Sequence, residues 1–132
     1  MLNAETQELL ATAITAIESG QLARAEALCQ RLLSAQPKHA GAKLVLARIR
    51  RLVGDFETGA ALAEEAARQM PKDPAPRIEA ALAHAAAGRR AQAETAARKA
   101  LRLAPGSIPA LLVLAETLKL AGKAVGSAAK FG

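Results

Sequence analysis

The chain has 132 residues, of which 52% are apolar and only 2% aromatic, and its formal net charge is +6. Its prevalent Ala, Leu, Glu, Gln, Lys and Arg residues favour helices. No apolar run approaches the roughly 20 residues that a membrane-spanning helix needs, and the start MLNAETQELL carries acids where a secretory signal has Lys or Arg. We therefore expect one cytoplasmic, all-α domain.

Glycine and proline recur along the chain with the same period. Glycines recur every 34 residues, at Gly20, Gly54, Gly88 and Gly122. Prolines follow the same period, at Pro37, Pro71 and Pro105. Self-similarity at a period of about 20 to 50 residues indicates a stacked repeat array. The chain therefore consists of three copies of one unit and part of a fourth.

Each unit is predicted to be a helical hairpin. In the first unit, apolar residues recur at helical spacing before Gly20, at Leu9, Leu10, Ala13, Ile14, Ala16 and Ile17. They recur again after it, at Leu22, Ala25, Leu28, Cys29, Leu32 and Leu33. The Gly lets the chain turn out of the first helix because it adopts positive φ without steric cost. The Pro ends the second helix because it lacks an amide hydrogen.

Small residues stand where the two helices of a hairpin would meet. One set lies five positions after the Gly, at Ala25, Gly59 and Ala93. The other lies seven positions before it, at Ala13, Ala47, Ala81 and Ala115. We expect both sets to permit a close approach of the paired helices.

The 34-residue period, the turn Gly, the closing Pro and the small residues together resemble the tetratricopeptide repeat family. The resemblance covers residues 6–122. It implies a single domain, residues 1–132, with units 6–39, 40–73 and 74–107 and a partial unit 108–132. The implied fold is a right-handed α-solenoid of stacked antiparallel helical hairpins.

The chain departs from the family where aromatic residues are usual. One aromatic slot holds Leu9, Lys43, Arg77 and Leu111, and another holds Ala16, Arg50, His84 and Leu118. We expect this loss of aromatic packing to weaken individual hairpins and to leave the fold intact.

The last unit differs from the others. Residues 108–121, IPALLVLAETLKLA, predict a first helix that is apolar on more than one side, and the following KAVGSAAKFG matches a second helix poorly. A terminal repeat needs a polar outer face. Three explanations remain open: the chain is a fragment, the apolar face is an oligomer interface, or a short irregular helix covers it with Val125 and Phe131.

In this family the working surface is a concave groove lined mainly by the first helix of each hairpin. The positions that the resemblance assigns to it are Leu10, Ile14, Ile17, Leu44, Arg48, Arg51, Ile78, Leu82, Ala85, Leu112, Glu116 and Lys119. An apolar groove with cationic spots suits an amphipathic partner segment that brings aliphatic anchors and a few acids. The alternative is that Leu10, Ile14, Leu44 and Ile78 pack between hairpins as core.

Some relatives hold the terminal carboxylate of a peptide with a clamp that needs Lys and Asn in the groove. The position of its first Lys is occupied here by Leu10, Leu44, Ile78 and Leu112. Binding of chaperone tails in that manner is therefore disfavoured.

We expect no catalytic, metal or cofactor site. His39 and His84 lie 45 positions apart and lack the spacing of metal ligands. Cys29 is the sole cysteine and lies on an apolar helical stripe, which favours a packed thiol. Glu64 is expected to form an i, i+4 ion pair with Arg68.

The leading hypothesis is therefore a non-catalytic protein-interaction scaffold that binds a peptide or helix segment, or a second copy through the apolar C-terminal helix. The alternative is an N-terminal accessory part of a larger bacterial enzyme such as a transferase. A nucleic-acid adaptor ranks third, because the net charge of +6 favours it and the near absence of aromatic stacking platforms opposes it.

Overall fold

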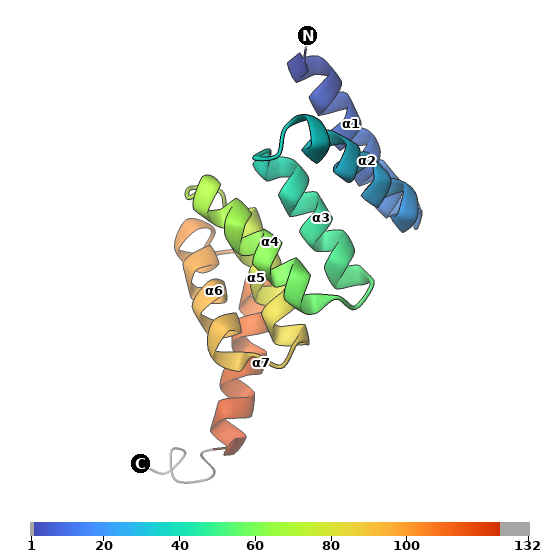
Figure 1. Cartoon of the computed structure of the whole chain (residues 1–132). Coiled ribbons are helices and arrows are strands. Elements are labelled where there is room, and N and C mark those ends of the chain that lie inside the picture. The colour runs from blue at the N-terminus through green and yellow to red at the C-terminus, as the bar shows by residue number, and fades with distance from the viewer. Residues whose placement is uncertain (1, 125–132) are drawn as a thin grey trace.

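The computed structural model describes residues 2–124, and the side chains of residues 4–119. The helices of this range are α1 (Leu2–Glu18), α2 (Leu22–Ala35), α3 (Ala40–Leu52), α4 (Phe56–Gln69), α5 (Pro74–Ala86), α6 (Arg90–Leu103) and α7 (Ile108–Ala124). Figure 1 shows three antiparallel pairs, α1 with α2, α3 with α4 and α5 with α6, stacked in chain order with α7 at the far end. The prediction of an all-α solenoid of stacked hairpins is confirmed.

Glycine makes the turn inside each complete hairpin. Gly20, Gly54 and Gly88 have φ angles of 78°, 91° and 79°. After the second of these glycines, the amide of Asp55 donates to the carbonyl of Arg50 at 2.8 Å, which satisfies an acceptor that the helix end leaves open. The predicted turns at these three glycines are confirmed.

The same prediction for Gly122 was wrong, because α7 continues through it to Ala124. A glycine permits a turn without imposing one, and it remains in a helix at a cost of about 1 kcal/mol relative to Ala. The proposed covering segment with Val125 and Phe131 lies outside the described residues.

The predicted small residues bring the paired helices together. Ala13 and Ala25 are fully buried in the first hairpin, as are Ala81 and Ala93 in the third. In the second hairpin, a Cβ added to Gly59 would lie 3.0 Å from the carbonyl oxygen of Ala47. The backbones of α3 and α4 are therefore almost in contact.

Ala115 does not take this role. It is exposed on α7, and no helix of the described residues packs against that side of it. Leu111 and Leu118, one turn before and after it, are 42% and 45% exposed. The apolar face predicted for this helix is therefore uncovered within residues 4–119.

Ion pairs occupy several slots where aromatic residues were expected from the family. Lys43 on α3 lies 3.2 Å from Glu65 on α4. Arg50 on α3 pairs with Glu26 on α2, across the boundary between two hairpins. These contacts replace part of the missing aromatic packing, although each half-exposed pair contributes only about 0–1 kcal/mol.

We expect Gly54→Ala to lower the free energy of unfolding by about 1–2 kcal/mol. A Cβ at Gly54 meets no atom within 4 Å, so the cost comes from the positive φ alone. Gly106→Ala is the matched control, because Gly106 is equally open and has no positive φ. Urea unfolding followed by circular dichroism should leave the control unchanged or about 0.5 kcal/mol more stable. Equal stability of the two variants would contradict the assigned role of Gly54.

Candidate functional site

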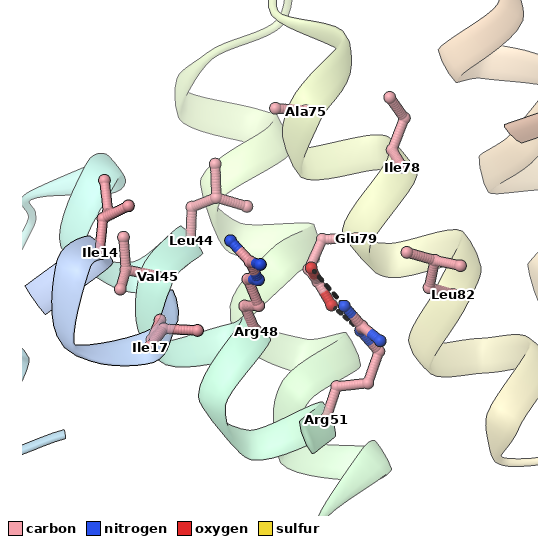
Figure 2. A pocket seen from close by; sticks show the side chains of 10 residues that line it. All are labelled: Ile14, Ile17, Leu44, Val45, Arg48, Arg51, Ala75, Ile78, Glu79 and Leu82. Carbon is pink, nitrogen blue, oxygen red and sulfur yellow. Dashed lines mark hydrogen bonds and ion pairs between the residues drawn. The ribbon is translucent and has the colours of Figure 1, made fainter. Parts of the chain in front are cut away.

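A groove of about 400 Å³ opens on the face formed by the first helices α1, α3 and α5. It is lined by Ile14, Ile17, Leu44, Val45, Arg48, Arg51, Ala75, Ile78, Glu79 and Leu82 (Figure 2). Apart from its three charged residues the lining is aliphatic. Three successive hairpins therefore contribute to one continuous apolar surface.

The helical period places these residues on one side of each helix. On α3, Leu44, Arg48 and Arg51 are spaced i, i+4 and i+7, which brings them to a common face. Ala47, on another face of the same helix, is buried in the core and lies against Gly59 of α4. Packing within the hairpin therefore leaves the groove side of α3 open.

Most of the predicted groove residues come together here, namely Ile14, Ile17, Leu44, Arg48, Arg51, Ile78 and Leu82. That they bind a peptide stays a prediction. Two others pack against the core instead: Leu10 against the cluster formed by α1, α2 and α3, and Ala85 against the cluster around α5 and α6.

The α7 residues Leu112, Glu116 and Lys119 are exposed and do not line this groove. The repeat pattern assigned them to it because it treats the fourth unit as equivalent to the first three. The groove described here is built from α1, α3 and α5 alone, and α7 lies beyond α5 in the stack.

The sequence pattern missed three groove residues, the aliphatic Val45 and Ala75 and the charged Glu79. Glu79 is the one that changes the chemistry of the groove. It lies next to Ile78 on α5, and its side chain is only 9% exposed. The Nε and Nη2 groups of Arg51 donate to its two carboxylate oxygens, the second at 3.3 Å. This bidentate ion pair joins α3 of the second hairpin to α5 of the third. Figure 2 shows it on one side of the groove. The available signal was that Glu79 is the only acid in α5.

Arg48 has a different environment. It is exposed, and it forms no ion pair with an acid among residues 4–119. In Figure 2 its side chain rises from α3 between Leu44 and the Arg51–Glu79 pair. Of the two arginines predicted in this part of the groove, Arg48 is therefore accessible and Arg51 is already bound to a carboxylate.

The histidines, which were the candidates for metal binding or catalysis, lie close to other groups of the protein itself. His39 is the N-cap residue just before α3, where its Nδ1 accepts a hydrogen bond from the amide of Ala42 at 3.0 Å. His84 is buried, and its Nε2 lies 3.6 Å from a carboxylate oxygen of Glu64, beyond hydrogen-bond distance. The expected Glu64–Arg68 ion pair does not form among the described side chains, because Glu64 is directed toward His84 instead.

Cys29 is buried in the core of the first hairpin, as expected for a packed thiol. Burial raises the pKa of its thiol from 9.0 to about 11 because the apolar surroundings disfavour the thiolate. Residues 4–119 hold no group of three or more His, Cys, Asp or Glu side chains suited to a metal ion. Among the helices that the structure describes, none is both long and apolar enough to cross a membrane.

The basic residues of α6 are partly neutralised. Arg98 donates to Glu94, four residues before it on the same helix, at 2.9 Å. Arg89, just before α6, donates to Glu57 of α4 at 2.6 Å. This surface does not present an uninterrupted positive stripe.

Known structures share this architecture at low sequence identity. The TPR domain of Sgt2 from Aspergillus fumigatus superposes with a TM-score of 0.85 at 21% identity, covering 91% of this chain and 81% of that one. The second TPR domain of human RPAP3, solved with the HSP70 peptide SGPTIEEVD, gives 0.80 at 15% identity, covering 89% and 98%. The chain therefore has the tetratricopeptide repeat fold.

A third similar structure belongs to a larger protein. An O-GlcNAc transferase of Thermobaculum terrenum gives a TM-score of 0.85 at 24% identity, with 89% of this chain covered. The chain spans only 23% of that transferase. Neither a protein-family model nor a curated protein sequence matches the chain.

We expect the Arg51–Glu79 pair to show strong energetic coupling. Arg51→Met should lower the free energy of unfolding by about 2–3 kcal/mol, because it leaves a buried carboxylate without its charged donor. Glu79→Met should cost less, because the partly exposed Arg51 can turn toward water. The double variant should be close to wild type, since neither charge is left buried alone. Urea unfolding of all four proteins tests this, and additive losses in the double variant would refute the coupling.

We expect native Cys29 to react slowly with iodoacetamide at pH 8. The rise in pKa from 9.0 to about 11 lowers its thiolate fraction at this pH about a hundredfold, and burial slows access further. The rate should recover in concentrated urea, and mass spectrometry of the alkylated chain gives both rates. Equal rates in the folded and unfolded chain would show that the thiol is not held in the core.

Proposed function

We propose that the chain is a non-catalytic protein-interaction module that holds an aliphatic segment of a partner protein in the groove of α1, α3 and α5. The observation that carries this proposal is the continuous aliphatic lining contributed by three hairpins. Leu44 and Ile78 are only half-buried and belong to neither of the two core clusters. A partner segment would remove their remaining apolar surface from water, which is favourable.

The size and composition of the groove support a peptide ligand. A volume of about 400 Å³ lies within the range of about 300–1,000 Å³ that is common for ligand sites. An amphipathic helix or an extended segment could place aliphatic anchors against Leu44 and Ile78. Acids on such a segment would meet the accessible arginine rather than the apolar lining.

The structure of human RPAP3 with the peptide SGPTIEEVD supports peptide binding by this architecture. The expected partner of the present chain differs from that acidic peptide, because Leu44 and Ile78 line the groove where a carboxylate clamp would need basic residues. We therefore infer that aliphatic anchors, with acids in a minor role, provide most of the affinity.

A second candidate function is an accessory domain of a larger enzyme. It is favoured by the similarity to the Thermobaculum terrenum O-GlcNAc transferase, in which the matched region is a minor part of the chain. In this arrangement the groove would hold a protein brought to a neighbouring enzymatic domain. Peptide binding by the groove is common to both candidates.

Self-association through α7 also remains a prediction of the sequence. Its support is the exposed apolar surface of that helix, where Ile108 and Leu112 are 64% and 65% exposed. This surface is separate from the groove lining, so the two modes of interaction do not compete for the same residues.

We expect Leu44→Gln and Ile78→Gln each to weaken peptide binding about tenfold, which corresponds to about 1.4 kcal/mol for a buried anchor contact. The probes are peptides selected from a random display library against the full chain, with affinities measured by fluorescence polarisation. Leu52→Gln is the control, because Leu52 is exposed on α3 outside the groove. Failure to select peptides, or equal affinity of all three variants, would overturn the proposal.

A further inference from the structure

We propose that the groove selects segments with a single carboxylate beside their aliphatic anchors, and that Arg48 binds this carboxylate. The inference rests on the proposed function and names the residue that sets its specificity. It follows from the pairing of the three charged residues of the lining: Arg51 and Glu79 bind each other, and Arg48 is left for a partner.

Arg51 already has a partner within the protein. Both oxygens of Glu79 accept hydrogen bonds from its guanidinium, and this carboxylate is largely buried. A ligand that took Arg51 away would leave Glu79 desolvated without its cation, which strongly opposes binding. Arg51 is therefore withheld from the partner, although its position on α3 faces the groove.

Arg48 is accessible to a partner. It lies one helical turn from both Leu44 and Arg51, and it has no acidic partner among the side chains of residues 4–119. Its planar guanidinium can donate two parallel hydrogen bonds to one carboxylate. The lining thus carries one positive charge that no described side chain balances.

This charge balance favours one acid over several. A first carboxylate on the partner pairs with Arg48 next to the anchor that packs on Leu44. A second carboxylate in the groove would meet aliphatic side chains or the carboxylate of Glu79. It would lose hydration without gaining a cation, and this loss opposes binding.

The test uses the peptides that the display selection yields on the full chain. We expect them to carry aliphatic residues and one Asp or Glu. Arg48→Gln should weaken their binding about tenfold, and exchange of the peptide acid for its amide should weaken binding to wild type by the same factor. The amide peptide should bind wild type and Arg48→Gln equally, because the interaction is already lost. Arg102→Gln, which removes the same charge from an exposed site on α6, should have no effect.

Two further variants sharpen the assignment. Arg48→Lys keeps the charge without the planar fork, so its affinity should lie between those of wild type and Arg48→Gln. Glu79→Gln removes the negative charge that occupies Arg51, so peptides with a second acid should gain affinity for this variant. Circular dichroism of each variant checks that the helices are retained.

The outcomes separate the two proposals. Selected peptides without an acid, or equal affinity of wild type and Arg48→Gln, would overturn the role of Arg48 and leave groove binding intact. Peptides whose affinity is insensitive to Leu44→Gln and Ile78→Gln would overturn the proposed function and this inference together.

Discussion

Close backbone contact inside each hairpin is the constraint on which the rest of the solenoid depends. Where α4 crosses α3, even a methyl carbon at Gly59 would lie only 3.0 Å from the carbonyl oxygen of Ala47, so a glycine is needed for this close approach. The corresponding Ala25 and Ala93 are fully buried in their own hairpins. Because one face of each first helix is used for this contact, another face stays open, and α1, α3 and α5 together form the groove.

Because the core is packed with small residues, polar contacts contribute to the alignment of neighbouring hairpins. Alanine buries little area, so the core gains less from each side chain than an aromatic core would. Arg50 reaches Glu26 of the preceding hairpin, and His84 lies near Glu64 of the preceding hairpin. These contacts favour one alignment of adjacent hairpins, because a shifted alignment would separate the partners. They share this role with the Arg51–Glu79 pair.

The sequence predicted the fold well because the period, the turns and the small residues are local signals repeated in each unit. It also placed Leu44, Arg48 and Ile78 on one surface, since helical spacing and the repeat register determine which residues share a face. It failed at Gly122 and Ala115, where the repeat pattern assumed a partner helix that the described residues do not provide. It also missed Glu79, because pairing between α3 and α5 depends on the superposition of two hairpins rather than on the spacing within one.

The Arg51–Glu79 pair links the shape of the groove to its chemistry. It joins the first helices of successive hairpins, and the distance between these helices sets the width of the surface that a partner would meet. Arg51 and Glu79 are already paired, so they lose little side-chain freedom when a ligand binds, which lowers the entropic cost of association. The same pairing leaves Arg48 as the accessible cation among the groove residues. One internal ion pair therefore contributes both to the preorganisation of the groove and to the distribution of charge within it.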